Sequence, residues 1–136
     1  MIFLLASVLL LLSNTRPCDK CKIGKDTLTG RTIYLTYDVE PECEGGKAAL
    51  MKRVNKTVFL PDSLLTSDID SRYIVSFIVE ADGQINGGRI NHDNTNQIGN
   101  QILKAVKSCR WIPGKCNGRN VPVLYRYSTI IDFKKN

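Results

Sequence analysis

Alternating apolar residues near the end of the chain predict a long β-strand. From Val121 to Phe133 every second residue is β-branched or aromatic, whereas the residues between them are mixed. A period of two is typical of a half-buried strand. Pro122 has no N–H to donate to a neighbouring strand, so its position favours a strand start or a sheet edge. An edge strand can bind a strand of another protein through its unpaired backbone groups, and the alternative is an ordinary core strand.

A second alternating segment predicts a hairpin. Apolar side chains alternate from Tyr73 to Val79, Asp82-Gly83 is a favoured two-residue turn, and residues 84–90 form the return strand. The Gly87-Gly88 pair in the return strand predicts a bulge or a close approach of another backbone. A shorter run of strand-forming residues, Arg31–Val39, predicts one additional strand before the hairpin.

Two segments have helical periodicity. In Lys47–Lys56 three apolar residues fall on one stripe, Leu50, Met51 and Val54. The second helix is predicted to begin at Asn94 as N-cap, with Gln97 completing a capping box. Its apolar stripe is longer and consists of Ile98, Ile102, Ala105, Val106 and Cys109.

This order of elements predicts an α+β fold: a small antiparallel three-stranded sheet with two helices packed on one face, plus a short extra N-terminal strand. At 136 residues the chain has room for one domain, which we assign to residues 31–136. Residues 1–13 contain an apolar run that is shorter than the roughly 20 residues of a membrane span. We interpret this run as a signal peptide or a short hydrophobic anchor, and residues 14–30 as a polar leader.

The chain has five cysteines, and this number suits an oxidising compartment in which thiols are paired. One of the five is then left over. Cys18 and Cys21 have the CxxC spacing of redox and zinc sites, but they stand in a polar leader, and zinc would need two more ligands close by. We favour stabilising disulfides, with Cys109 and Cys116 as a candidate local pair.

The positive charge is concentrated at the C-terminal end. Residues 99–136 contain eight Lys or Arg and one Asp, a net charge of +7, whereas residues 1–98 contain 11 basic and 12 acidic residues. Such a patch attracts acidic partners, anionic lipid or nucleic acid. Because the sequence has no helix-turn-helix, zinc-finger or aromatic-glycine RNA motif, we expect no nucleic-acid partner.

No recognisable catalytic set is present in the sequence. His92-Asp93 lies between the hairpin and the second helix, where a polar loop histidine is the simpler interpretation. No serine stands in a nucleophile-elbow pattern, and no pair of carboxylates flanks a pocket motif. We therefore expect a non-enzymatic protein with no catalytic residue, no metal site and no cofactor.

Several segments together resemble the C-terminal domain of TonB, in particular the TonB-like energy transducers of Bacteroidetes-type bacteria. The resemblance runs from Glu42 to about Phe133 and depends on the order and spacing of short motifs. These are PECEGGKAAL at 41–50, VSFIVEADGQI at 75–85, ILKAVK at 102–107, WIPGK at 111–115, GRNV at 118–121 and IDF at 131–133.

The resemblance implies a periplasmic domain that binds the TonB box, an extended segment of outer-membrane receptors, as a strand beside its own last strand. It also implies an inner-membrane motor complex as a second partner. Arg126 and Tyr127 are expected to tune the choice of partner. The full set of candidate partner-binding residues is Val123, Tyr125, Arg126, Tyr127, Ser128, Thr129 and Ile131.

The segment between Ser13 and the folded part is short. Its roughly 20 to 30 residues would reach on the order of 100 Å when fully extended, so we expect a stand-alone module. It would be exported to the periplasm, or anchored in the inner membrane and facing the periplasm. The alternative is an exported, envelope-associated structural or protein-interaction domain with no transport role, and an exposed edge also permits a homodimer.

Overall fold

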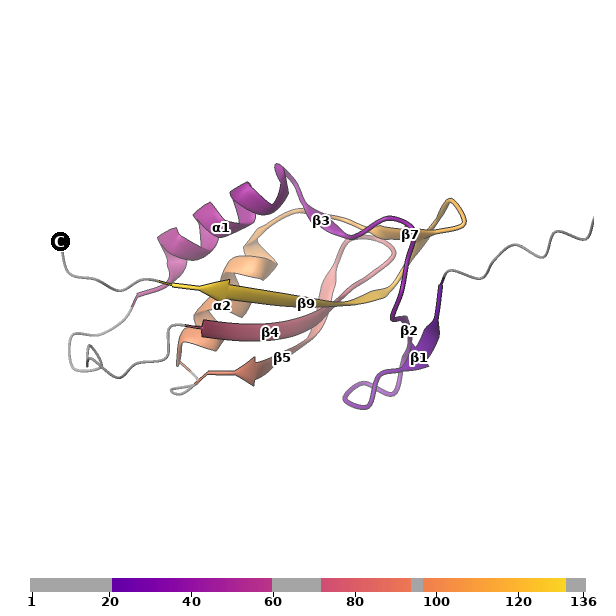
Figure 1. Ribbon diagram of the computed structural model, residues 1–136, viewed down its shortest axis with the longest axis horizontal. Helices are drawn as coiled ribbons and strands as arrows, with labels where there is room; N and C mark the ends of the chain where they lie inside the picture. The colour runs from indigo at the N-terminus through magenta and orange to yellow at the C-terminus, as the bar shows by residue number, and fades with distance from the viewer. Residues whose placement is uncertain (1–20, 60–71, 94–96, 132–136) are drawn as a thin grey trace, which may run out of the picture.

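The computed structural model describes residues 21–59, 72–93 and 97–131. In this part of the chain the fold is α+β, as predicted, and contains two helices, a five-stranded sheet and two small two-stranded sheets (Figure 1). The elements in chain order are β1 (Ile23–Lys25), β2 (Thr32–Tyr34), β3 (Glu42–Cys43), α1 (Gly46–Thr57), β4 (Arg72–Val79), β5 (Ile85–His92), α2 (Gln97–Ser108), β6 (Trp111–Ile112), β7 (Gly114–Cys116), β8 (Arg119–Val121) and β9 (Val123–Ile130).

The main sheet is mixed rather than purely antiparallel. Its strand order is β1-β2-β9-β4-β5. β4 is antiparallel to both β5 and β9, and these are the three strands of the predicted sheet. β1 and β2 form an antiparallel hairpin, and β2 joins β9 in the parallel direction through one residue pair, Tyr34 and Val123. The prediction of a three-stranded antiparallel sheet is therefore corrected to a mixed five-stranded one.

The two additional strands have only three residues each, which is too short to show a period-two pattern. β2 falls within the Arg31–Val39 stretch that was predicted as a strand. β1 lies in residues 14–30, which we interpreted as a polar leader. Tertiary contacts hold this hairpin in place: Ile33 is almost fully buried, and the buried Asp26 binds Arg89 of β5.

β4 is buried on both faces, although its apolar alternation indicated a single core face. The residues that face the helices are the predicted ones, Tyr73, Val75, Phe77 and Val79. Ile74, Ser76 and Ile78 on the opposite face are buried as well. At Ile78 the loop after β1 approaches the sheet, since a Cβ placed on Gly87 would lie 3.2 Å from Thr29 and 3.3 Å from Ile78.

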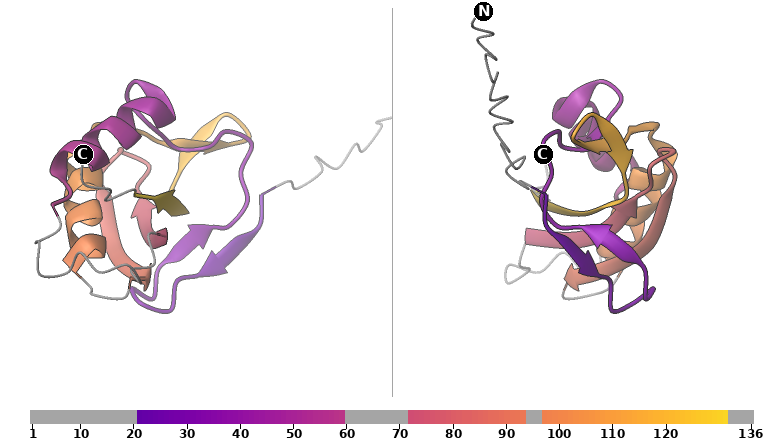
Figure 2. Two further views of the ribbon diagram at one scale, coloured as in Figure 1. Left: turned by 60° about the vertical axis from the view of Figure 1, so that its left-hand side comes forward. Right: turned by 90° about the vertical axis from the view of Figure 1, so that its right-hand side faces the viewer.

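Both helices lie on the same side of the sheet (Figure 2). α2 buries most of its predicted stripe, and Leu103 is buried with it. In α1 Leu50 and Val54 are buried, but Met51 is 54% exposed, so the prediction that Met51 belongs to the core stripe was wrong. The helix begins after Gly45 and packs against α2 and β3 through Leu50 and Val54, whereas Met51 points away from these contacts into solvent.

Asp93 contributes to the start of α2, and the predicted N-cap is not tested. Asn94 lies outside the described residues. The Asp93 carboxylate accepts a hydrogen bond from the N–H of Gly99 in the first turn. A carboxylate in this position satisfies one of the N–H groups that a helix start leaves unpaired, and its charge interacts favourably with the helix dipole.

The turn between β4 and β5 has three residues, not the two that were predicted. The Gly83 N–H donates to the Glu80 carbonyl at 2.9 Å, and the Glu80 N–H donates to the Gln84 carbonyl at 2.8 Å. Gly83 has a φ of 85°, which favours glycine, and a Cβ there would lie 2.5 Å from the Trp111 carbonyl oxygen. A type I turn with a following left-handed residue has this pattern.

Two disulfides join distant parts of the chain, Cys43 with Cys109 and Cys21 with Cys116. The predicted local pair Cys109–Cys116 was therefore wrong. Cys109 follows α2 and lies in the core beside β3, whereas Cys116 is in β7 and packs in a second cluster near Cys21. The Cα atoms are 6.0 Å apart in the Cys43–Cys109 pair and 6.2 Å apart in the Cys21–Cys116 pair. Both separations are normal for a disulfide. Two such bonds indicate an oxidising compartment.

Replacing Cys43 and Cys109 by alanine should lower the free energy of unfolding by about 4 kcal/mol, because the disulfide closes a long loop in the unfolded chain. Urea denaturation of the oxidised proteins measures this loss. Wild-type protein reduced with dithiothreitol is the control and should fall at least as far, since it loses both bonds. Peptide mapping without reduction should recover Cys43–Cys109 and Cys21–Cys116 peptides, and a Cys109–Cys116 peptide would contradict the assignment.

Candidate functional site

One side of β9 is the feature that this fold leaves available. On its other side β9 pairs with β4 along its whole length, from Val123 to Ile130. Within the described residues β2 is the only strand that pairs with the available side, and it does so at Val123 alone (Figure 1). In this part of the structure the edge of β9 from Tyr125 to Ile130 is therefore unpaired. We call it the open edge.

The contact with β2 indicates which backbone groups face the open edge. The Tyr34 N–H donates to the Pro122 carbonyl oxygen at 2.9 Å, so this carbonyl points away from β4. Successive residues of a strand direct their backbone groups to opposite sides. The N–H and C=O groups of Arg126, Ser128 and Ile130 therefore point to the open edge, and those of the residues between them point to β4.

The predicted partner-binding residues divide between core and surface. Four of them have buried side chains: Val123, Tyr125, Thr129 and Ile131. Tyr127 is half-buried against the core under the helices, and Arg126 and Ser128 are exposed. The backbone groups of Val123, Tyr125 and Thr129 point to β4, so these residues offer the open edge no hydrogen bonds. Side-chain contacts with a partner are thus available to Arg126, Tyr127 and Ser128.

The outer edge of β5 is less regular than the open edge of β9. Register shifts interrupt the pairing of β5 with β4 at two places, and Gly87 has a φ of 60°. Such irregularities bend an edge and hinder the addition of another strand. β9 pairs with β4 residue by residue without a shift. For this reason we place the candidate site at β9.

A cavity of about 230 Å³ adjoins β9 at Tyr125. This volume is below the roughly 300 to 1,000 Å³ of most small-molecule sites, and it has room for a side chain of a partner. The wall is partly apolar and carries charges at its rim. Besides Tyr125 the lining residues come from the segment before α1, the start of α1 and β6: Glu40, Pro41, Glu42, Cys43, Gly46, Lys47, Leu50 and Trp111.

Three packed aromatic rings make the inner wall of this cavity rigid. The ring centroids of Phe77 and Trp111 are 5.2 Å apart, and Tyr125 lies 5.5 Å from Phe77 and 5.6 Å from Trp111. These separations and the tilted orientations are favourable for aromatic pairs. The indole N–H of Trp111 donates to the Val106 carbonyl at 2.8 Å and fixes the ring against α2.

The polar group at the cavity is the hydroxyl of Tyr125. Burial, and secondly the Glu40 carboxylate that accepts its hydrogen bond, raise the pKa of Tyr125 to about 12. The hydroxyl therefore stays protonated at physiological pH and acts as a donor rather than as a base. Glu40 also lies 3.8 Å from the ammonium group of Lys47, and both side chains are exposed to solvent.

Asp26 was missed by the sequence analysis, although its carboxylate is buried and accepts several hydrogen bonds. Its carboxylate binds the Arg89 guanidinium through two contacts of 2.6 and 2.9 Å and accepts the Thr29 hydroxyl at 2.6 Å. Arg89 first, and then Thr29, hold the pKa of Asp26 well below its ordinary value of 3.8, while burial acts in the opposite direction. The interaction fastens the β1–β2 hairpin to β5.

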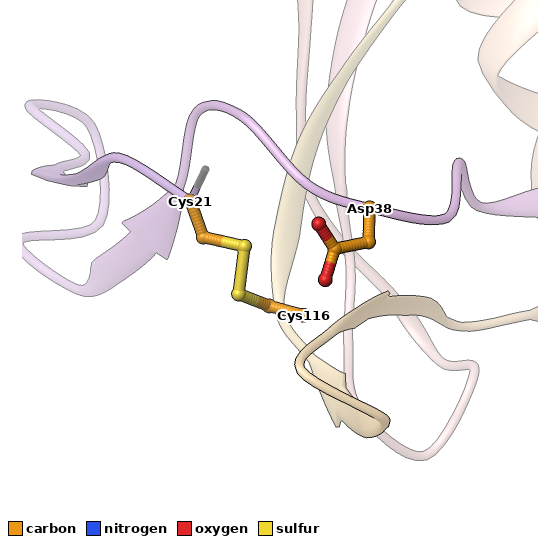
Figure 3. Close-up of side chains that lie close together, drawn as sticks. All are labelled: Cys21, Asp38 and Cys116. Atoms are coloured by element: carbon orange, nitrogen blue, oxygen red, sulfur yellow. A yellow bond between two sulfur atoms is a disulfide. The ribbon is translucent and has the colours of Figure 1, made fainter. Parts of the chain in front are cut away.

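Cys21, Asp38 and Cys116 also lie close together, with ligand atoms within 4.8 Å of one another (Figure 3). The two sulfur atoms are bonded to each other as a disulfide, whereas metal binding by cysteine requires thiolates. The Asp38 carboxylate accepts the Asn117 N–H at 2.8 Å. We interpret this group as a structural contact, in which the disulfide and the Asp38 hydrogen bond connect the N-terminal segment to the β7–β8 turn.

Comparisons of this chain with protein-family models, with curated proteins and with solved structures find no match. The candidate site therefore stands on its geometry and on the residues that form it.

Replacing Asp26 by asparagine should lower the free energy of unfolding by about 2 kcal/mol at neutral pH, because charge-assisted hydrogen bonds are lost. The folded-state pKa of Asp26 is depressed, so its stabilisation is complete above the unfolded-state value near 3.8 and is lost as the pH falls below it. The stability of the wild type should thus fall more steeply on acidification than that of Asp26→Asn. Urea unfolding across this pH range measures the slopes. Asp82→Asn, in an exposed turn, is the control, and equal slopes for the two variants would contradict this assignment.

Proposed function

We propose that this protein is a non-enzymatic interaction domain that binds an extended segment of a partner by strand addition at the open edge of β9. The observation that carries the proposal is the pairing of β9. This long and regular strand is bonded to β4 on one side, and among the described residues it is unpaired from Tyr125 to Ile130 on the other. An exposed strand edge is a template for main-chain hydrogen bonds.

The backbone of β9 would supply most of the affinity. Arg126, Ser128 and Ile130 direct N–H and C=O groups outward, and each hydrogen bond to a guest strand contributes about 0.5 to 1.5 kcal/mol. Because these bonds do not depend on the side chains of the guest, they place little demand on its sequence. They require only that the guest be extended and free of proline at the bonded positions.

Side chains would select among extended guests. Alternate side chains of a strand point to opposite faces of a sheet, so one row of guest side chains would point toward the helices. The cavity beside Tyr125 lies on that side and has room for one of them. The other row would lie next to Arg126 and Ser128, which are exposed on the opposite face.

We infer the partner from the resemblance of residues 42–133 to TonB C-terminal domains. The guest would be the TonB box of an outer-membrane receptor, and the domain would act in the periplasm in energy-coupled transport, driven by an inner-membrane motor complex. Two observations support this inference. β9 is the last strand of the described chain, and the two disulfides fit an oxidising compartment. None of the helices in residues 21–59, 72–93 and 97–131 is long and apolar enough to cross a membrane.

Replacing Ser128 by proline tests the proposal, because this change removes an N–H that points to the open edge and leaves the bonds to β4 in place. We expect a folded protein that binds receptor-box peptides roughly 10-fold more weakly. The probes are synthetic peptides that span the TonB boxes of receptors encoded in the same genome. In an NMR titration of the wild type, the amides of Arg126, Ser128 and Ile130 should shift most.

Ser128→Ala is the matched control, since it removes the same hydroxyl but keeps the backbone N–H, and it should bind like the wild type. Equal binding by Ser128→Pro and Ser128→Ala would contradict the proposal, as would a titration in which no amide of residues 124–130 shifts. A dimer that forms through this edge in the wild type, disappears in Ser128→Pro and binds no receptor peptide would assign the edge to self-association instead.

A further inference from the structure

The outer surface of the two helices carries positive charge without any acidic residue. Neither α1 nor α2 contains an aspartate or a glutamate. Natural surfaces usually intersperse charges of both signs, which limits repulsion between like charges. The cations of the two helices are Lys47, Lys52, Arg53, Lys56, Lys104 and Lys107, and all of them are exposed.

The packing of the helices brings five of these cations onto one surface. The Arg53 guanidinium donates to the Ser108 carbonyl at 3.0 Å, and the Gln101 side chain binds the backbone of Phe59. The helices are thus antiparallel, and the middle of α1 lies beside the end of α2. Lys52, Arg53, Lys56, Lys104 and Lys107 form what we call the basic face.

A shallow hollow of about 410 Å³ opens within the basic face, and three of its cations line it together with Ser108. In residues 21–59, 72–93 and 97–131 no cation of this face takes part in an ion pair, whereas Lys47 pairs with Glu40. The charge of the basic face is thus not neutralised by the described residues. An anionic surface would be attracted by these charges.

One large apolar side chain projects next to these cations. Phe59, which directly follows α1, is 72% exposed. The exposure of Phe59 is fixed by its backbone, because its N–H donates to the Gln101 side-chain oxygen at 2.6 Å and its carbonyl accepts the Gln101 amide at 2.9 Å. Cations combined with an exposed Phe are typical of helical elements that lie in a membrane interface.

We propose that the basic face binds the surface of an anionic lipid bilayer. The cations attract the headgroups, and Phe59 enters the boundary between headgroups and acyl chains. Nucleic acid would satisfy the cations but would leave Phe59 in water. The two disulfides also place the protein in an oxidising compartment, outside the usual location of nucleic acid.

Binding to lipid vesicles tests this proposal with the full chain. We expect the protein to sediment with vesicles that contain phosphatidylglycerol, to do so less at high salt, and to bind vesicles of phosphatidylcholine alone only weakly. The variant Lys52→Gln, Lys56→Gln, Lys104→Gln should lose on the order of 100-fold in vesicle binding, at roughly 5-fold per cation. Phe59→Ser should weaken binding at low and at high salt.

The matched control carries the same change in net charge on other elements: Lys22→Gln, Lys25→Gln, Arg119→Gln. It should bind the anionic vesicles only slightly more weakly than the wild type does, because the basic face is intact and only the net charge is lower. Equal binding by the two triple variants would overturn the proposal, because the apolar N-terminal run or net charge alone would then account for binding. Tighter binding of a DNA duplex than of anionic vesicles would also overturn it. Ser128→Pro should retain vesicle binding, so this proposal and that for the open edge fail separately.

Discussion

The attachment of the N-terminal hairpin is the constraint on which the candidate site depends. Asp26 is buried, and its charge is tolerated there because Arg89 and Thr29 satisfy the carboxylate. The Cys21–Cys116 disulfide joins the same segment to the β7–β8 turn. Together these contacts hold β2 against the first residue of β9. Since β2 contributes one residue pair, it defines where the open edge begins and leaves the rest of β9 unpaired among the described residues.

The open edge would bind through backbone hydrogen bonds and the basic face through electrostatic attraction, and both belong to the same folded domain. Tyr125 belongs to the core through Phe77 and Trp111, so β9 is ordered before a guest binds, and less conformational entropy has to be lost on binding. Hydrogen bonds along β9 are directional and select an extended chain. The charges of the basic face act without fixed geometry and favour an extended anionic surface. A protein with both could bind a membrane surface and a peptide at the same time.

Local periodicity determined much of the secondary structure. The alternation from Val121 to Phe133 predicted β9, which begins after Pro122 at Val123, while Val121 belongs to β8 and residues 132–133 lie outside the described residues. The alternation from Tyr73 to Val79 predicted β4, and the stripe of α2 predicted its buried side. These predictions held because side-chain direction repeats along a single element and needs no knowledge of distant neighbours. The candidate partner-binding residues on β9 came from the resemblance to TonB C-terminal domains, and the alternation already placed Arg126 and Ser128 on one face and Thr129 on the other, as observed.

Only the tertiary structure decided which distant residues meet. Cys109 and Cys116 are close in sequence, yet their partners are 66 and 95 residues away, because each faces a different hydrophobic cluster. The pairing of Asp26 with Arg89 and the addition of three-residue strands to the sheet have the same cause. The basic face combines cations of α1 and α2, which are far apart in the sequence. A charge count along the sequence could not show this, and it placed the excess of positive charge at the C-terminal end alone. Sequence patterns report the environment along one element, whereas contacts between elements are set by packing in three dimensions.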